Sequence, residues 1–321
     1  MLLQRRFEER TAEAYALGKI GGFCHLYIGQ EAVSTGVLSA LRADDYIITT
    51  YRDHGQALAR GIPPRAVMSE LFGRVDGVVK GKGGSMHLFD RNVNFLGGHG
   101  IVGAHVPLAT GIGFAIKYRG TDQVCVCFMG ESVVNTGAFH EALNMAGLWK
   151  LHVLYIIENN RYGMGTALER ASAIHDIFER GASYNMPREQ CDGQDVFAVR
   201  EAAQEAIARA RREQLPTLLE VRTYRFMGHS MSDAVSGTYR TKAELDEQMK
   251  RDPIMLLRLH MQEAGELTDA ELQALDTEVK AVVQDAWDFA DKSPEPPLEA
   301  LYEDVYVDTT SDATAEAVAS E

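Results

Sequence analysis

The sequence predicts an α/β protein organised around a strand–helix–strand unit, and three features of residues 124–160 support this prediction. Val124 to Met129 is a short apolar run rich in valine and cysteine, which suits a buried parallel strand. A helical pattern follows from about Gly137 to Lys150, and a second apolar run spans His152 to Ile157. Because such crossovers are right-handed, both strands are expected to end at one edge of the sheet, where ligands bind in open α/β folds.

Oxygen-bearing side chains stand at the ends of these two strands. Glu131 follows the first strand, and the amides Asn159 and Asn160 follow the second. Oxygen ligands are what a hard cation such as magnesium prefers, particularly a cation that already carries phosphates. An ordinary strand-to-helix turn is the plainer explanation of so short a pattern, so the flanking residues decide between the two.

The spacing resembles the thiamine diphosphate motif, in which Gly-Asp-Gly precedes Asn-Asn by a gap in the mid-twenties. Here 26 residues lie between Ser132 and Asn159. Two positions differ from the motif, because Glu131 stands at the aspartate position and Ser132 at that of the second glycine. The longer carboxylate and the added side chain predict weaker cofactor binding, since magnesium tolerates only near-octahedral geometry at short distances.

The N-terminal residues predict two helices joined by a glycine-rich loop. Residues 4–17 are amphipathic, and a second helix is expected from Gln30 to about Leu41. His25 lies in the loop between them. A loop histidine is more often a satisfied polar group than a catalyst, but its near-neutral pKa is also suited to catalysis.

A third strand is expected at Tyr46 to Thr50, and Arg52 follows its end. An arginine there can bind phosphate through a two-pronged contact, or form a surface salt bridge. Pro63 and Pro64 predict the start of another helix, which runs to about Phe72.

Residues 80–105 are the most glycine-dense part of the chain. Gly100 to Gly103 leads into a helix expected at Ala104 to Lys117, whose free N–H groups suit a diphosphate or a polar ring edge. Methionine, histidine, phenylalanine, isoleucine and valine are interleaved with the glycines, which argues against a linker.

The C-terminal half predicts a helix at about Val196 to Arg212 and a strand at Leu218 to Tyr224, with His229 just past that strand. Catalytic groups concentrate at such positions. Capping boxes at Thr241 and Thr268 predict two further helices. The second should reach about Asp291, with one apolar face made of Leu272, Leu275, Val279, Val282, Ala286 and Phe289.

Composition limits the classes of function. The 321 residues carry a formal net charge of −14, and the 56 residues from Glu266 onward hold 16 acids and two bases. The rest of the chain is therefore neutral, and no basic patch offers a footprint for nucleic acid. No apolar run is long enough to span a bilayer, and the first residues show no signal peptide.

The four cysteines form no Cys-x-x-Cys pair. Cys125 and Cys127 should point to one face of their strand, so we expect them to pack in the core of a protein from a reducing cytoplasm. We expect an α/β domain at 1–265, a C-terminal helix with an acidic extension packed on it at 266–308, and a disordered tail at 309–321.

A family resemblance covers residues 5–307. The chain resembles the α subunits of the thiamine diphosphate-dependent decarboxylating component of pyruvate dehydrogenase complexes. The matching stretches are 22–32 (GFCHLYIGQEA), 51–55 (YRDHG), 60–74 (RGIPPRAVMSELFGR), 80–89 (KGKGGSMHLF), 97–118 (GGHGIVGAHVPLATGIGFAIKY), 141–151 (EALNMAGLWKL), 158–166 (ENNRYGMGT), 192–202 (DGQDVFAVREA), 224–233 (YRFMGHSMSD) and 251–254 (RDPI).

The resemblance implies the thiamine diphosphate-binding fold, a mostly parallel sheet with helices on both faces. It also implies an α2β2 heterotetramer that decarboxylates pyruvate and passes the acetyl group to a lipoyl group on a dihydrolipoyl acyltransferase. The enzyme would be an oxidoreductase with a disulfide acceptor. A glutamate of the β subunit starts the reaction in this family, so this chain alone should be inactive.

The resemblance further implies roles for individual residues. His25 and His229 would be catalytic, and Glu131, the Asn160 side chain and the Tyr162 carbonyl would hold Mg²⁺. The residues expected to bind the cofactor are Tyr51, Arg52, Gly100, Val102, Gly130, Glu131, Ser132, Val133, Asn160, Tyr162 and His229.

Four alternatives stay open at this point. Acetoin dehydrogenase α subunits share these motifs, whereas branched-chain specificity is disfavoured by residues 80–89 and 224–233. A non-catalytic paralogue with weakened cofactor binding would account for Glu131 and Ser132. A dinucleotide-dependent dehydrogenase is disfavoured, because no Gly-x-Gly-x-x-Gly follows the first strand.

Overall fold

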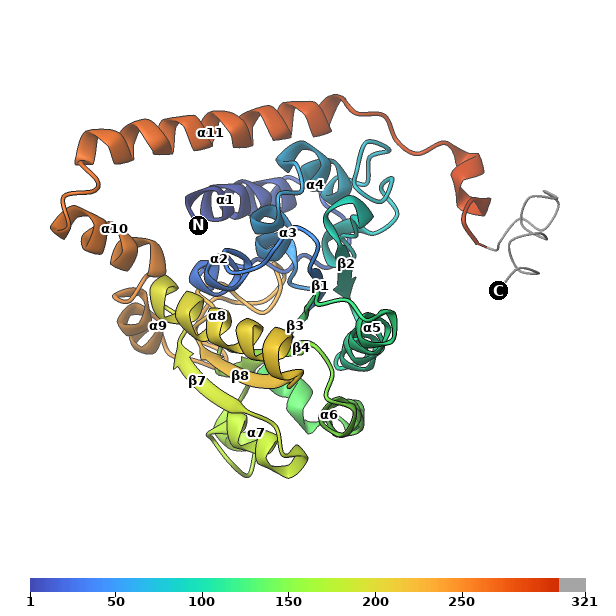
Figure 1. The fold of residues 1–321 in the computed structure, drawn as a ribbon. Coiled ribbons are helices and arrows are strands. Elements are labelled where there is room, and N and C mark those ends of the chain that lie inside the picture. The colour runs from blue at the N-terminus through green and yellow to red at the C-terminus, as the bar shows by residue number, and fades with distance from the viewer. Residues whose placement is uncertain (306–321) are drawn as a thin grey trace.

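The computed structural model describes residues 1–305 and is built on a six-stranded, fully parallel sheet with the order β2-β1-β3-β4-β8-β7 (Figure 1). The strands are β1 (Tyr46–Thr50), β2 (Phe95–His99), β3 (Cys125–Gly130), β4 (Val153–Asn159), β7 (Arg188–Asp192) and β8 (Thr217–Arg222). From β3 the chain adds strands in one direction, whereas β1 and β2 lie in the other. The junction of β1 and β3 is therefore the topological switch point, where open α/β sheets bind ligands.

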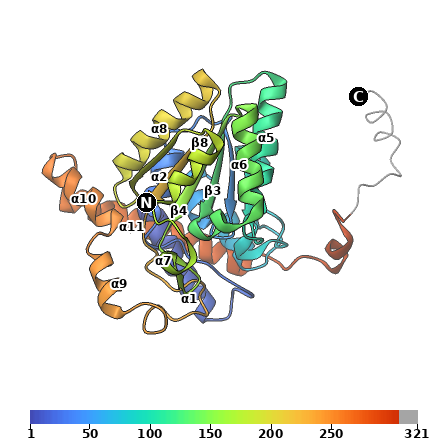
Figure 2. The same ribbon diagram turned by 90° about the horizontal axis from the view of Figure 1, so that it is seen from below.

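Helices cover both faces of the sheet, as predicted. Helices α2 (Glu31–Leu38) and α8 (Val196–Glu213) lie on one face, and α5 (His105–Arg119) and α6 (Gly137–Trp149) lie on the other (Figure 2). Along β3, Val126 and Phe128 join the core beneath α2 and α8, whereas Cys125, Cys127 and Met129 join the other core. This alternation follows from the two-residue period of a strand, and it confirms that the two cysteines share one buried face.

The remaining elements complete the cover around these layers. The other helices are α1 (Leu2–Ala16), α3 (His54–Arg60), α4 (Pro64–Leu71), α7 (Leu168–Ala171), α9 (Lys242–Met249), α10 (Pro253–Glu263) and α11 (Asp269–Lys292). Short 3-10 segments occupy 84–86, 91–93, 131–135, 177–184 and 298–302, and β5 (Tyr162–Gly163) pairs with β6 (Thr166–Ala167). No helix within residues 1–305 has the length and apolar character needed to cross a membrane.

The sequence patterns did not indicate β2, β7, α3 or α10. Strand β2 contains Gly97 and Gly98 and lies in the glycine-dense part of the chain, where no strand was predicted. Gly97 has a φ of +94°, and a Cβ on Gly98 would lie 2.0 Å from the Asp53 carboxylate. Close approach of backbones therefore explains these glycines. Edge strand β7 is mostly polar, so it lacks the apolar alternation that marks a half-buried strand.

Helix α11 begins at the predicted capping box, in which the Thr268 and Glu271 side chains each bond the other residue's backbone. The predicted apolar face was partly wrong, because Leu275 and Val282 are exposed. The side chains buried against α1 and α4 are Val283, Ala286, Trp287 and Ala290. Figure 1 shows α11 running over α1 and α4. The ion pairs Arg65–Asp285 and Arg6–Asp276 also join α11 to these two helices. The predicted tail at 309–321 lies outside the described residues.

Trp287 is the main anchor of α11, so its truncation should destabilise the fold. Its ring meets Phe72 edge-on at 5.4 Å between centroids, and the Arg10 guanidinium lies 4.0 Å above it. We expect Trp287→Ala to lower the free energy of unfolding by about 3 kcal/mol. Urea unfolding of the full chain measures this change. Leu275→Ala, on the exposed side of the same helix, should change it by less than about 0.5 kcal/mol, and equal losses would contradict this account of the packing.

Candidate functional site

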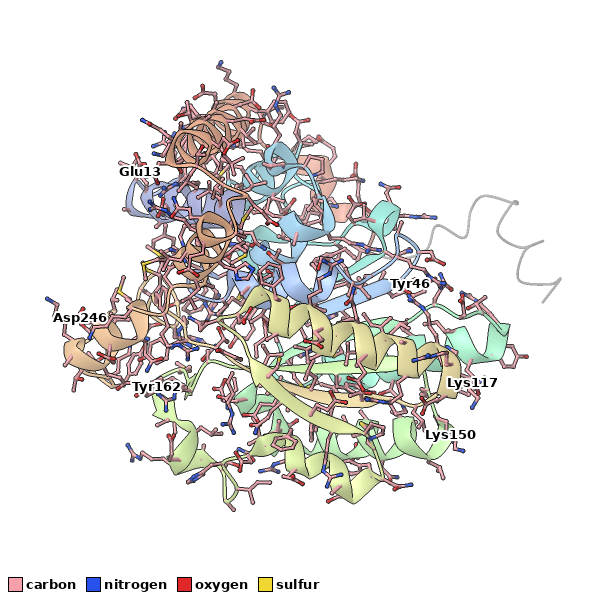
Figure 3. The ribbon with its side chains drawn as sticks, turned by 60° about the vertical axis from the view of Figure 1, so that its left-hand side comes forward. Glu13, Tyr46, Lys117, Lys150, Tyr162 and Asp246 are labelled. Carbon is pink, nitrogen blue, oxygen red and sulfur yellow. The ribbon has the colours of Figure 1, made fainter. Side chains whose placement is uncertain are left out.

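A cavity of about 600 Å³ lies at the carboxyl ends of the strands, over the switch point between β1 and β3. Figure 3 shows Tyr162, which lines this cavity, on the opposite side of the molecule from Tyr46 at the start of β1. The residues expected to be catalytic or to bind the cofactor and the cation all line it, namely His25, Tyr51, Arg52, Gly100, Val102, Gly130, Glu131, Ser132, Val133, Asn160, Tyr162 and His229. The fold thus brings together positions that lie up to 204 residues apart in the chain.

Glu131 is a buried carboxylate that forms no ion pair within residues 1–305, although the charge of Arg225 lies near enough to oppose the rise in its pKa. Its Oε2 has no hydrogen-bond partner there, and its Oε1 accepts only a 3.3 Å bond from the Ser132 hydroxyl. Burial raises the pKa of Glu131, because the charged form loses hydration. A buried carboxyl group with an unused oxygen is suited to a cation, whose charge would offset the cost of burial.

Two further oxygens face the same region. The Asn160 Oδ1 accepts hydrogen bonds from the Tyr162 backbone N–H at 3.4 Å and from Arg225 at 3.3 Å. The Tyr162 carbonyl also accepts from Arg225, at 3.1 Å. Carboxylate, amide and carbonyl oxygens are the donor set that magnesium prefers, so the residues present fit such an ion. Asn159 is not part of this set, because its amide donates to Glu220 at 2.8 Å and lines a separate polar cavity.

The serine in place of the motif's second glycine is accommodated by another glycine. A Cβ at Gly163 would lie 1.9 Å from the Ser132 hydroxyl oxygen, so only glycine leaves room for this side chain. The Ser132 hydroxyl therefore lies between Gly163 and the Glu131 carboxylate.

Arg52 ties the two loops that carry the histidines. It is buried, and its guanidinium donates to the Leu26 carbonyl at 2.6 Å and to the His229 carbonyl at 2.8 Å. Burial, followed by the nearby Arg225, lowers the pKa of Arg52 to about 10, so it remains charged at neutral pH. The phosphate contact expected of Arg52 stays a prediction, and what the structure shows is that Arg52 fixes the backbone beside His25 and at His229.

His25 and His229 lie side by side in the cavity wall, with their rings in edge-to-face contact. Their ring centroids are 5.1 Å apart, and the Tyr51 ring lies 4.5 Å from His25. Burial, together with the charge of Arg52, lowers the pKa of His25 to about 2 and that of His229 to about 4. Both imidazoles are therefore neutral at physiological pH, and each can donate one N–H without carrying charge.

A chain of buried side chains holds the His25 loop in place. The Glu8 carboxylate bonds His54 Nδ1 at 2.9 Å, and His54 Nε2 bonds the Ser85 hydroxyl at 2.9 Å. The backbone N–H of His25 in turn donates to Ser85 Oγ at 3.4 Å. Position 25 is thus linked through three side chains to helix α1.

The lowered pKa values of the two histidines predict a pH-dependent stability. The unfolded chain binds protons on these histidines near pH 6.5, whereas the folded chain does not until pH falls to about 4 for His229 and lower for His25. Their contribution is therefore present above pH 6.5 and declines as pH falls below it.

We expect the double variant His25→Asn/His229→Asn to lose less stability than the parent chain between pH 7 and 5. Urea unfolding at several pH values measures this. The comparison of variant with parent is needed because buried Asp53 and Glu158, whose pKa values are raised to about 7, give a slope of opposite sign. Parallel stability curves for the two chains would contradict the prediction.

Sequence patterns gave no role to several polar residues of the cavity wall, among them Gln30, Glu158 and Arg225. Glu158 is the penultimate residue of β4, directly after its apolar run, and it accepts hydrogen bonds from the Tyr27 hydroxyl and from Gln56. Arg225 follows β8 and lies four residues before His229. Position was the one available signal for Glu158 and Arg225. Glu158 lies at the carboxyl end of β4 and Arg225 follows β8, and the carboxyl ends of these strands border the cavity.

Comparison with known proteins supports one family. The dehydrogenase E1 component family matches residues 1–299 of the chain. The chain is 51% identical over 306 residues to the pyruvate dehydrogenase E1 component subunit alpha of Rhizobium meliloti (strain 1021), covering 95% of this chain and 87% of that protein. The subunits of the same name from Rickettsia felis and Zymomonas mobilis are 46% and 47% identical, over 95% and 96% of this chain and 93% and 86% of their own lengths.

Proposed function

Because the chain belongs to the dehydrogenase E1 component family, we propose that it is the α subunit of a pyruvate dehydrogenase E1 component. The reaction is the oxidative decarboxylation of pyruvate with transfer of the acetyl group to a lipoyl disulfide. The observation that carries the proposal is that the residues expected to be catalytic or to bind the cofactor and the cation all line one cavity at the switch point of the sheet. The extensive identity to three pyruvate dehydrogenase subunits favours pyruvate over acetoin and over branched-chain substrates.

The family implies thiamine diphosphate as the cofactor, and we propose Mg²⁺ as its cation. Glu131, the Asn160 side chain and the Tyr162 carbonyl would hold the ion, since the Glu131 oxygen without a partner in residues 1–305 fits it. Tyr51, Arg52, Gly130, Ser132 and Val133 would surround the diphosphate, and Gly100 and Val102 the aminopyrimidine.

When bound, thiamine diphosphate supplies the nucleophilic carbon and the electron sink that decarboxylation of a 2-oxo acid requires. The chain itself contributes position and electrostatics. Arg52 holds the loops of His25 and His229, and these neutral imidazoles direct N–H donors toward oxygens on which negative charge develops. The guanidinium of Arg52 disfavours the protonated form of either histidine, so each serves as a neutral hydrogen-bond donor rather than as a general acid or base.

The partners follow from the same proposal. A β subunit completes the site in an α2β2 heterotetramer, and the chain is inactive without it. The acetyl group passes to a lipoyl-bearing dihydrolipoyl acyltransferase. The four cysteines are free, in keeping with a reducing compartment such as the bacterial cytoplasm.

The test is a calorimetric titration of thiamine diphosphate with Mg²⁺ into the chain co-purified with its β subunit, followed by turnover of pyruvate and of acetoin with a dye acceptor. We expect cofactor uptake and carbon dioxide release from pyruvate. Turnover of acetoin alone would make the chain an acetoin dehydrogenase subunit. A stable complex without cofactor uptake would make it a non-catalytic paralogue, for which Glu131 and Ser132 would be the first residues to revert to Asp and Gly.

A further inference from the structure

The carboxamide of Gln30 forms part of the cavity wall beside the proposed cation ligands. Gln30 is the residue before α2, and its side chain is fully buried. Its Oε1 accepts a hydrogen bond from Asn160 Nδ2 at 3.1 Å. No motif assigned a role to this residue, yet it touches a proposed ligand of the cation and lines the cavity.

The orientation of both amides follows from the neighbours of Asn160. Its Oδ1 receives the Tyr162 backbone N–H and the Arg225 guanidinium, and neither of these groups can accept a hydrogen bond. The Asn160 amide must therefore turn its oxygen toward them and its NH₂ toward Gln30. Since that NH₂ only donates, Gln30 must present its own oxygen to Asn160, and its Nε2 is directed elsewhere.

The Gln30 Nε2 donor is left unsatisfied by the described chain. It is buried, and residues 1–305 provide no acceptor within hydrogen-bond distance. The great majority of buried donors in folded proteins have a partner, so an acceptor is expected from outside the chain. The position beside Asn160 places that acceptor next to the proposed cation, where the oxygens of a bound diphosphate would gather.

We propose that Gln30 binds the cofactor diphosphate through Nε2 and, through Oε1, keeps the Asn160 oxygen directed toward the cation. This inference rests on the proposed function. One carboxamide thus serves both partners of an ion pair, because its donor meets the anion and its acceptor fixes a ligand of the cation. A side chain with only one of these groups can serve only one partner.

Gln30→Glu separates the two roles. Glutamate keeps an oxygen for the Asn160 NH₂ but replaces the donor by a second carboxylate oxygen, which repels a diphosphate. Calorimetry of the full chain with its β subunit should show an affinity for Mg²⁺–thiamine diphosphate lowered about 10- to 100-fold, the range for loss of a hydrogen bond to a charged group. Mg²⁺–pyrophosphate, used as a probe of the diphosphate alone, should lose affinity by a similar factor.

Gln4→Met is the matched control, since Gln4 is equally buried and lies away from the cavity. Its Nε2 donates to the Ser34 hydroxyl and the Gly55 carbonyl, both at 2.7 Å. This variant should lower the Tm of the complex and leave both affinities unchanged. Gln30→Met, which loses both the donor and the acceptor, is the second variant in case Gln30→Glu does not fold. We expect it to weaken binding of both ligands by about tenfold or more.

Three results would overturn the inference. Unchanged affinity for thiamine diphosphate in a folded Gln30 variant would mean that water satisfies Nε2. Weaker binding of thiamine diphosphate with unchanged binding of pyrophosphate would place the acceptor elsewhere on the cofactor. Absence of cofactor binding by the parent complex would defeat the proposed function and this inference together, and this outcome is distinct from the other two because it does not involve the variants.

Discussion

Glu131→Gln is expected to weaken Mg²⁺-dependent binding of thiamine diphosphate strongly while making the ligand-free chain more stable. The parent carboxylate is buried with one oxygen unpartnered among residues 1–305, so its charge is costly until a cation binds. Glutamine has the same size and removes the charge. We expect the affinity for the Mg²⁺–cofactor complex to fall by about 100-fold or more, since even outer-shell changes at metal sites cost about 10- to 100-fold.

Two measurements of Tm, one without and one with ligands, test this prediction. The ligand-free Glu131→Gln complex should melt at a higher temperature than the parent, whereas the increase in Tm caused by Mg²⁺ and thiamine diphosphate should disappear. Loss of binding with a lower ligand-free Tm would mean that the variant is simply damaged. Unchanged binding would show that Glu131 does not hold the cation.

The double variant Glu131→Asp/Ser132→Gly restores the thiamine diphosphate motif, and it tests whether cofactor affinity can be raised rather than lowered. The structure gives Ser132 room beside Gly163, so this double variant should fold. If the departures from the motif weaken binding, the variant will bind the cofactor more tightly than the parent. Equal affinities would show that the backbone already places the longer carboxylate at the correct distance.

The sequence located the residues that line the cavity better than it predicted several of the elements around them, and the reason is physical. Strands β3 and β4 are buried on both faces, so they read as continuous apolar runs whose ends can be located. Any polar residue just beyond such ends must lie at the ligand-binding edge. Strand β2 gave no such signal, because Gly97 and Gly98 are required where Phe89 and Asp53 approach the backbone.

Contacts between distant segments account for what could not be predicted. The bonds of Arg225 to Asn160 and Tyr162 join the ends of β4 and β8, and no local pattern records that these ends are adjacent. The buried face of α11 shows the same limit. Its apolar residues can be grouped into more than one helical face. The face that contains Trp287 is the buried one because Phe72 and α1 lie against it.

The second large effect is expected at His25, where His25→Phe should lower kcat by about 10²- to 10³-fold with little change in cofactor affinity. Phenylalanine keeps an aromatic ring against Tyr51, whose centroid lies 4.5 Å from that of His25, but it removes the N–H donor. Loss of one preorganised donor to developing negative charge has this magnitude. His25→Gln, which retains a donor, should recover part of the lost rate.

The pH dependence separates this role from acid–base catalysis. A histidine that donates while neutral should add no limb of its own to the pH profile of kcat between about pH 6 and 8, because burial and Arg52 lower the pKa of His25 to about 2 and that of His229 to about 4. The profiles of the parent and of His25→Phe should therefore have the same shape, including any limb near pH 7 from Glu158, whose pKa burial raises to about 7. A limb of the pH profile near 6.5 that vanishes in His25→Phe would instead show that His25 transfers a proton. If His25→Phe weakened cofactor binding as much as it slowed turnover, the ring would be a binding element, and the donor role would pass to His229 alone.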